Sequence, residues 1–366
     1  MEEYQAAPPR DRGRTARKPV FLVNIGTRAD EILTILNSII GSRYHLGEAV
    51  VYLMSPRSSP FFNTELLKEA AETREEAKEL HDSLEHFLES LRRMKDNGFI
   101  QDLVHVDKLT LFQNEPVASH HIFSRRYLKR LLTEILVRAI NISRSTGSEV
   151  DLYIPLPGWP HTAYPVLEHF DNFFGGGYRG VRTHRVDLTL FRFRDPRNGA
   201  RKWAWEIDEV LKGAAELQRE LREEMYVREY GHLVEIMWEQ PWSRGEEGSI
   251  CAYAIVAALH EAAREHCREG EPCEIYYQGL FEHLVKGRDF YSRICGGSIP
   301  SLRKEQQKDL WLSLREWLEK TRLVPILGEF IESGIRLSGL GAELCGWVYE
   351  VEEKLLSQAR GTTPLP

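Results

Sequence analysis

The sequence predicts an α/β protein, with a doubly wound sheet in its N-terminal part and a mainly helical C-terminal domain. Three observations support this fold class. Short apolar runs alternate with helical patterns between residues 20 and 195, as in parallel sheets covered by helices. Helical periodicity dominates after residue 200. The charge balance also changes there, because residues 1–199 hold 27 Lys/Arg and 26 Asp/Glu, whereas residues 200–366 hold 21 and 29.

The first predicted unit is a strand, a helix and a second strand. Residues 20–25 read Val-Phe-Leu-Val-Asn-Ile and end at Gly26, which is typical of a strand buried on both faces. Residues 30–40 carry apolar side chains at helical spacing, and residues 49–54 form another apolar run that ends before Pro56. Such a succession predicts a βαβ unit.

The rest of the N-terminal part follows the same alternation. Three more helices are expected at 63–96, 127–142 and 164–173, and three more strands at 103–106, 150–155 and 183–194. The helices are predicted from apolar stripes at helical spacing, and the strands from short apolar or alternating runs. The helix at 127–142 is expected to end near Gly147.

Beyond residue 200 the pattern is helical. Six segments show this periodicity, at 204–225, 250–266, 276–284, 306–320, 324–332 and 341–357. Strand candidates there are limited to 233–237 and 274–277. We therefore expect three parts: a flexible basic arm at 1–18, a sheet domain at 19–199 and a mainly helical domain at 200–366.

The composition excludes several protein classes. A chain of 366 residues with 42% hydrophobic and 28% charged residues is expected to be globular rather than disordered. No apolar run approaches the roughly 20 residues that cross a bilayer. None follows the N-terminal arm as a signal peptide would require. We therefore expect a cytoplasmic protein with no membrane partner.

The five cysteines indicate the same compartment. Cys251, Cys267, Cys273, Cys295 and Cys345 are an odd number and contain no Cys-x-x-Cys pair. This pattern argues against a disulfide scaffold and against a structural zinc site, and it fits a reducing environment. No cofactor and no metal site are expected.

The first candidate binding loop follows the strand at 20–25. Ligands of doubly wound sheets bind at the carboxyl ends of strands, beside the point where the strand order reverses. In this loop Gly26 permits close backbone approach, and Thr27 offers a hydroxyl group. Arg28 adds a positive charge next to the free N–H groups of the following helix, which attract anions. A helix-capping turn would use the same residues, so that alternative stays open.

The second candidate loop follows the strand at 150–155. Trp159 can stack on a base, and His161 and Thr162 can donate hydrogen bonds. The alternative interpretation is that Pro-Gly-Trp-Pro forms only a rigid corner. Neither loop matches the GxGxxG or the GxxxxGK[ST] pattern, so the sequence does not support an NAD-binding or ATP-binding loop.

Other motifs are weaker candidates. A glycine-rich loop at 175–180 is followed by basic side chains, and Arg179, Arg182, His184 and Arg185 could together contact phosphate. A solvated loop is the preferred interpretation, because these glycines do not join a strand to a helix. Arg179 and His184 have the spacing of a ribonuclease motif, but they fall on a loop and a strand rather than a helix.

The C-terminal half offers no complete catalytic motif. His260 begins an HExx sequence, but the position of the second zinc ligand is Arg264, so a zinc protease is excluded. Cys251 is interpreted as a buried residue at a helix start rather than as a nucleophile. Glu235 and Glu239 could pair for acid–base chemistry, and one face of a secondary-structure element explains them equally well.

The N-terminal half resembles a CARF domain, the Rossmann-like sensor of CRISPR-associated ancillary proteins. The resemblance rests on residues 20–32, VFLVNIGTRADEI, where a strand is followed by Gly-Thr, a small residue and a helix. It also rests on the strand at 150–154 with its glycine-containing loop. The matching ligand-binding positions are Gly26, Thr27, Arg28 and Ala29 in the first loop and Gly158, Trp159, His161 and Thr162 in the second.

The resemblance implies a sensor in antiviral defence. Its two loops would face the two-fold axis of a homodimer and bind a cyclic oligoadenylate second messenger, and the C-terminal half would act as effector or regulator. The second loop departs from the family pattern, because it has no lysine and Trp-Pro-His replaces the usual small residues. Ligand ring size and ligand cleavage are left open by this departure.

Three functions are therefore compared. The first is a sensor of cyclic oligoadenylate that switches a helical effector, as a homodimer or higher assembly with a protein partner at its C-terminal domain. The second is a nucleotide-processing hydrolase, of ring-nuclease or glycosidic type, in which Thr27, His161 and Glu235 would act. The third is a structural or assembly protein that uses its tryptophan-rich acidic half as an interface.

Overall fold

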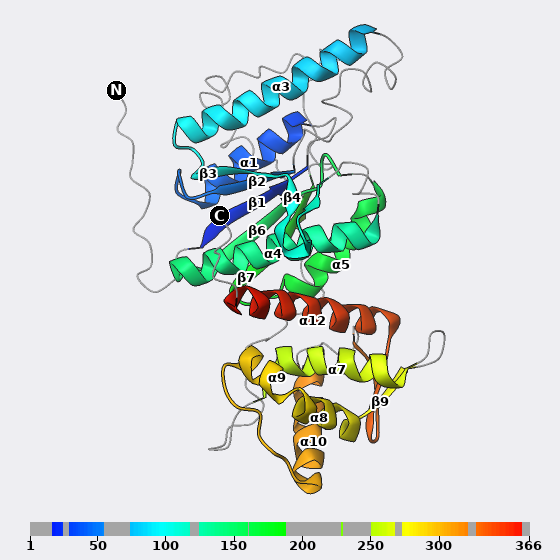
Figure 1. Cartoon of the computed structure of the whole chain (residues 1–366). Coiled ribbons are helices and arrows are strands. Elements are labelled where there is room, and N and C mark those ends of the chain that lie inside the picture. Colours follow the sequence, from blue (N-terminus) through cyan, green and yellow to red (C-terminus); the bar gives the residue numbers. More distant parts are fainter. Residues whose placement is uncertain are drawn as a thin grey trace.

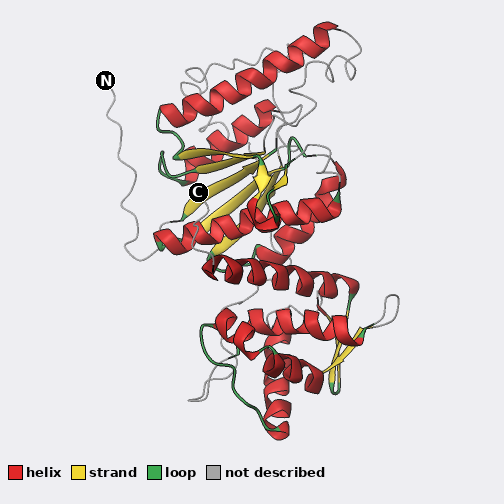
Figure 2. Cartoon of the chain, viewed as in Figure 1, coloured by secondary structure: helices red, strands yellow, loops and turns green. Residues whose placement is uncertain are grey.

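The structure is a computed structural model that describes residues 17–24, 29–54, 74–117, 124–159, 161–187, 228–229, 250–267, 273–320 and 327–360. It is an α/β protein with a Rossmann-like doubly wound sheet in the N-terminal part and a mainly helical C-terminal part (Figures 1 and 2). The arm at 1–16, the helix expected at 204–225 and the strand expected at 233–237 lie outside the described residues.

The main sheet has the strand order β3-β2-β1-β6-β7-β8. Its first five strands are parallel, and they are β1 (Lys18–Val23), β2 (Val50–Met54), β3 (Asp102–Val106), β6 (Val150–Pro155) and β7 (Val181–Asp187). The short strand β8 (Arg228–Glu229) pairs antiparallel with β7. The strand order reverses between β1 and β6, because the chain runs from β1 outward to β3 and from β6 outward to β7.

Helices cover both faces of this sheet (Figure 1). They are α1 (Ala29–Arg43), α3 (Arg74–Asp96), α4 (Arg125–Thr146) and α5 (Tyr164–Phe174). Alternate residues of each strand enter separate cores: Phe21 and Val23 pack with α1 and α3, whereas Val20 and Leu22 pack with α4 and α5. Burial on both faces explains why these strands are nearly continuous apolar runs.

The remaining elements of the N-terminal part are small. They are β4 (Lys108–Leu109), η3 (Thr110–Phe112), β5 (Glu115–Pro116) and η5 (His161–Ala163). The buried carboxylate of Glu134 on α4 holds the β4–β5 turn, since it accepts a hydrogen bond of 2.8 Å from the Leu111 N–H. Arg138 donates to the same carboxylate at 2.9 Å and balances its charge.

The C-terminal part packs helices against a small antiparallel sheet. Its helices are α7 (Ala252–His266), α8 (Tyr277–Lys286), α9 (Arg288–Cys295), α10 (Lys304–Lys320) and α12 (Gly339–Arg360). Its strands are β9 (Cys273–Tyr276), β10 (Gly328–Ile331) and β11 (Gly334–Leu337), in the order β10-β11-β9. Helix α12 lies between the sheet domain and α7 (Figure 1), and one continuous hydrophobic cluster includes residues of both parts.

Most predicted elements of the described chain are confirmed. The five strands and four helices of the sheet domain occur where expected, although only residues 74–96 of the helix predicted at 63–96 and residues 181–187 of the last strand are described. Gly147 ends α4 with a φ of 65°, as predicted. No helix among the described residues is long and apolar enough to span a membrane.

The helix predicted at 324–332 is wrong. Residues 328–331 form β10, which pairs with β11 as a hairpin (Phe330 opposite Ile335), and β11 pairs in turn with β9. The apolar residues of this short segment fit helical spacing as well as strand spacing, so the local pattern misleads. Gly328 decides the conformation, because its φ is 147° and a Cβ there would come within 2.0 Å of the Arg336 carbonyl oxygen.

The expectation of unpaired cysteines is also wrong. Cys251 and Cys295 form a disulfide that joins the start of α7 to the end of α9, and Cys267 and Cys273 form another that closes the segment between α7 and β9. Cys345 is the free, buried thiol of α12. An odd number of cysteines only requires one unpaired residue, so it does not exclude disulfides between the other four.

This pairing predicts the thiol content of protein purified without reductant. Denatured protein should show one reactive thiol per chain, from Cys345, and five after reduction. Titration with a chromogenic thiol reagent measures both numbers. The Cys345→Ala variant is the control and should show none before reduction. Five thiols in unreduced wild-type protein would contradict the pairing.

Candidate functional site

The two strands that lead into the candidate loops end side by side at the carboxyl edge of the sheet. Strands β1 and β6 are neighbours and parallel, with Val20 opposite Leu152. The loops that leave them therefore start at the same edge, and they do so where the strand order reverses. This is the position at which doubly wound sheets bind ligands.

A direct contact joins the two loops. The buried side chain of Asn24, the first residue after β1, donates from Nδ2 to the Gly158 carbonyl oxygen at 2.5 Å. Gly158 has a φ of 92°, and a Cβ there would come within 2.3 Å of the Asn24 carbonyl oxygen and 3.2 Å of Ile32 Cδ1. Only glycine fits this close approach without a backbone shift.

Two helices begin next to this contact. Helix α1 starts at Ala29, after the first loop, and α5 starts at Tyr164, after the second loop and η5. The free N–H groups of a helix N-terminus and the helix dipole favour an anion. The edge between β1 and β6 thus combines close backbone approach with the N-terminus of α1 and with the start of η5, which leads directly into α5. Free N–H groups at these places suit a phosphate-bearing ligand.

The structure describes some of the predicted binding residues and not others. Gly26, Thr27 and Arg28 lie outside the described residues, and Ala29 is the first residue of α1. In the second loop, Gly158 makes the contact with Asn24, and Thr162 is exposed within η5. His161 begins η5, and its side chain is outside the described set.

Trp159 is part of the core beneath the second loop. Its side chain is 5% exposed and belongs to the cluster that includes α4 and α5. Its indole N–H has no hydrogen-bond partner among the described residues. In this conformation the ring supports the loop from below, and it does not present a face to solvent.

Three of the four basic side chains at 179–185 are engaged within the protein rather than solvated. His184 Nε2 lies 3.1 Å from Asp151 Oδ1, which also lies near Arg17. Arg185 lies 3.6 Å from Asp171, a carboxyl whose pKa burial raises to about 6. Both side chains are therefore engaged inside the sheet domain. Arg182 is exposed.

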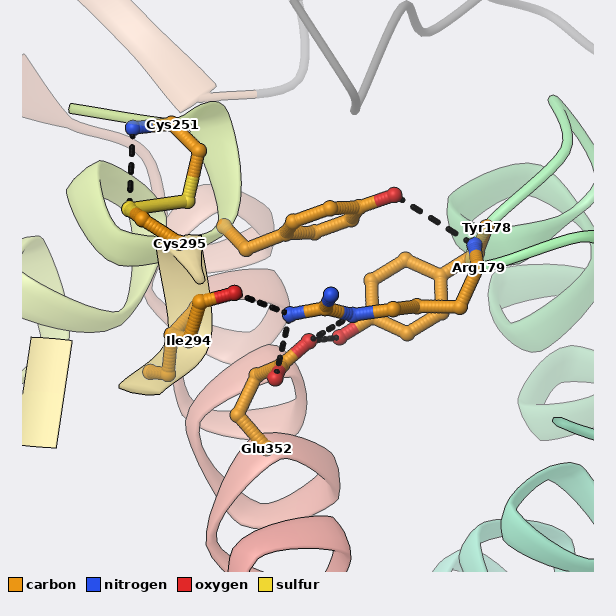
Figure 3. Close-up of polar contacts among 7 residues, drawn as sticks. Tyr178, Arg179, Cys251, Ile294, Cys295 and Glu352 are labelled. Atoms are coloured by element: carbon orange, nitrogen blue, oxygen red, sulfur yellow. Dashed lines mark hydrogen bonds and ion pairs between the residues drawn. A yellow bond between two sulfur atoms is a disulfide. The ribbon is translucent and has the colours of Figure 1, made fainter. Parts of the chain in front are cut away.

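Arg179 is the centre of a polar junction between the two parts of the chain (Figure 3). It donates from Nε to Glu352 Oε1 at 2.9 Å and from Nη2 to Glu352 Oε2 at 2.7 Å. Nη2 also donates to the Ile294 carbonyl oxygen of α9 at 2.9 Å. The guanidinium carbon lies 4.1 Å from the ring centre of Tyr253 on α7. One arginine before β7 thus contacts three C-terminal helices.

The partners of Arg179 are almost fully buried. Glu352 is 1% exposed and accepts a third hydrogen bond, of 2.5 Å, from the Tyr178 hydroxyl. Burial raises the pKa of Tyr178 well above its ordinary value, so this group stays a donor. Burial alone would lower the pKa of Arg179, but Glu352 outweighs it, and the pKa is raised. The Arg179 guanidinium therefore stays charged.

An apolar contact joins the same two parts. Trp347 of α12 is 2% exposed and packs among three residues of α5, the α5 phenylalanines, which are Phe170, Phe173 and Phe174. Its indole Nε1 donates to Thr133 Oγ1 of α4 at 3.0 Å. One turn earlier, Lys129 and Arg125 flank Glu343 and lower its pKa despite partial burial.

The other sequence candidates have structural roles or are not described. Cys251 is disulfide-bonded. His260 packs against Tyr349 with the two rings tilted, and burial lowers the pKa of His260. Glu235 and Glu239 lie outside the described residues. Asn24 and Glu352 were not singled out from the sequence. The position of Asn24 at a strand end was an available signal, whereas nothing near Glu352 in the sequence marks it.

Comparison with known proteins identifies no family. No protein-family model matches the chain, and no curated protein matches it. Among solved structures, a chain titled Enterococcus italicus Csm6 bound to cyclic hexa-2'-fluoro-hexa-dAMP is similar, with 10% sequence identity and a TM-score of 0.30. The alignment covers 95% of this chain and 82% of that one.

The loop contact predicts that the free energy of unfolding is unusually sensitive to substitution of Gly158. Gly158→Ala should lower the free energy of unfolding by about 2–4 kcal/mol, because the new Cβ collides with the Asn24 carbonyl at a left-handed φ. Urea unfolding measures the change. Gly147→Ala is the matched control, since its φ is 65° with no atom within 4 Å, and it should lose about 1 kcal/mol. Equal losses would show that the loops do not approach so closely.

The Arg179–Glu352 pair predicts strong energetic coupling. In a double-mutant cycle with Arg179→Met and Glu352→Gln, each single change should destabilise by about 3 kcal/mol, because it leaves a buried polar group unpaired. The coupling energy should exceed about 1 kcal/mol. The exposed pair Glu89–Arg93 on α3 is the control, with expected coupling of at most about 0.5 kcal/mol. If the losses of the two single variants simply add in the double variant, Arg179 and Glu352 are not an interacting buried pair.

Proposed function

We propose that this chain senses a cyclic oligonucleotide at the edge between β1 and β6. The observation that carries the proposal is the contact of the two strand-end loops at the reversal of strand order, through Asn24 and Gly158. Ligands of this fold class bind in such a crevice. The CARF-like pattern of residues 20–32 supports cyclic oligoadenylate as the ligand and CRISPR antiviral defence as the setting.

The chemistry of the edge fits a phosphate-rich ring. The N-terminus of α1 would offer backbone N–H groups to phosphate oxygens. At the second loop the corresponding N–H groups belong to η5, because η5 leads directly into α5 and Pro165 has no N–H. Arg28 would supply a charge-assisted hydrogen bond, and Thr162 an exposed hydroxyl group. We propose a homodimer in which the two-fold axis passes beside these loops, so that a ring of repeated nucleotides meets equivalent groups from both protomers.

The signal would pass from the second loop to α12. The loop leads through η5 into α5, and the α5 phenylalanines enclose Trp347 of α12. A ligand that moves the N-terminus of α5 would thus act on a helix that also contacts α7 and α9 through the Arg179 junction. Packed elements of this kind shift as units rather than deforming continuously.

The C-terminal part is proposed to act on a protein partner or on assembly. Residues 200–366 carry 21 Lys/Arg and 29 Asp/Glu. Affinity for polynucleotide comes chiefly from Lys and Arg contacts to phosphate, so this balance disfavours a nuclease that holds long nucleic acid. The proposed compartment is the cytoplasm, where such a messenger and its target would meet. This proposal rests on the CARF-like pattern of residues 20–32, because the two disulfides remove the cysteine argument for a reducing compartment.

Calorimetry of the full chain with cyclic tri-, tetra- and hexa-adenylate tests the proposal. At least one ring should bind, and Arg28→Ala and Thr162→Ala should each weaken binding about tenfold by removing a donor to phosphate. Arg92→Ala on the exposed side of α3 is the control and should bind as the wild type does. Failure of all three rings to bind would sink the proposal.

Two further readouts separate the competing functions. Chromatography of the ligand after incubation should show an intact ring, whereas cleavage would favour a ring nuclease that uses His161. Light scattering with and without ligand should show a ligand-dependent change in assembly or shape. Assembly that is the same in both states, together with absence of binding, would favour a structural protein.

A further inference from the structure

Three potential metal ligands converge at the far end of the C-terminal part. They are Glu265 and His266, the last two residues of α7, and His283 in the last turn of α8. One ligand atom from each lies within 4.8 Å of the others. Glu265 and His266 are exposed and His283 is half-buried, so an ion could enter directly from solvent. Helices α7 and α8 are neighbours in Figure 1.

The structure holds these side chains in place before any ion binds. Helices α7 and α8 share a buried apolar interface, formed by Leu259, Ala262, Leu280, Phe281 and Leu284. The Cys267–Cys273 disulfide fixes the chain directly after His266. The imidazole of His266 lies against Gly279, whose added Cβ would be 3.7 Å from Nε2. Ligands on rigid elements bind metal better than ligands on free loops, because less ordering is required.

The contact between His283 and Glu265 has the spacing of two ligands of one ion. His283 Nε2 lies 3.0 Å from Glu265 Oε2. The nitrogen is buried, yet the pair lacks hydrogen-bond geometry. Two ligands that each lie about 2.0–2.1 Å from a tetrahedral zinc ion are about 3.3 Å apart. A small outward shift of the carboxylate would therefore accommodate the ion.

The local charges favour a cation at this place. Helix α7 ends at His266 and α8 ends at Lys286, and the free carbonyl groups of helix C-termini carry partial negative charge. Glu265 adds a full negative charge. Lys286 opposes this, since its Nζ lies 3.9 Å from Glu265 Oε1. Its side chain is 62% exposed, so it can turn into solvent when an ion binds.

We propose that Glu265, His266 and His283 form a binding site for Zn²⁺ or a similar divalent transition-metal ion. Two imidazoles and one carboxylate are a ligand set that zinc accepts, with the fourth position open to water or to an exogenous ligand. The ion would link the end of α7 to the end of α8. This site lies in the C-terminal part, whereas the proposed nucleotide site lies in the sheet domain, so each can be tested without the other. It also revises the expectation that the chain holds no metal.

Metal titration of the full chain tests the site. Protein freed of metal with a chelator, without reductant, is titrated with Zn²⁺ against a chromophoric chelator. We expect one equivalent per chain, and His266→Ala and His283→Ala should each weaken binding by at least about tenfold. Zn²⁺ should also raise the melting temperature of the wild type more than that of either variant. Substitution with Co²⁺ should give the visible absorption of a four-coordinate site.

Matched variants make the outcome decisive. His86→Ala, which removes an exposed histidine from α3, should leave binding unchanged. Lys286→Gln should strengthen binding, because it removes the opposing charge. The Cys267→Ser/Cys273→Ser double variant should still bind, but more weakly, because it loses the crosslink directly after His266. Loss of binding there together with unchanged binding in both histidine variants would assign the ion to thiols instead. Less than half an equivalent in the wild type, or equal affinity in all histidine variants, would overturn the proposal.

Discussion

The burial of Trp347 against α5 is the interaction on which the arrangement of the whole chain depends. This side chain joins the outer layer of the sheet domain to a helix that also packs on α7, so the two parts share one apolar core. Loss of a buried tryptophan removes about 3–5 kcal/mol, which is a large share of the 5–15 kcal/mol that stabilises a typical domain. The sheet domain and the C-terminal helices therefore depend on each other for stability.

The polar junction restricts the relative orientation of the two parts that this apolar contact joins. The planar guanidinium of Arg179 matches the Glu352 carboxylate with two hydrogen bonds and reaches the Ile294 carbonyl with a third. A buried pair of this kind contributes little net stability over an apolar equivalent, but it tolerates few alternative alignments. The apolar layer holds α12 against the sheet domain, and the ion pair fixes its rotation and register. A ligand at the β1–β6 edge would therefore act on a small number of relative positions.

The sequence could predict features that depend on local pattern, and it could not predict features that depend on distant neighbours. The strands were predictable because a run such as Val20–Val23 is buried on both faces, and the strand-end position of both loops follows from the same runs. The contact of Asn24 with Gly158 joins residues 134 positions apart, and Arg179 meets Glu352 across 173 positions. The Cys251–Cys295 disulfide spans 44. Partners at such distances are decided by topology, which spacing and counts do not encode.

The place of α12 in the chain has a consequence for biosynthesis. The α5 phenylalanines leave the ribosome long before Trp347 does, and at typical elongation rates the interval is on the order of 10 to 30 seconds. During this time the α5 phenylalanines lack the contact with Trp347 that they make in the folded chain. A nascent sheet domain would thus be a substrate for chaperones, and premature termination before α12 would yield an aggregation-prone product rather than a free sheet domain.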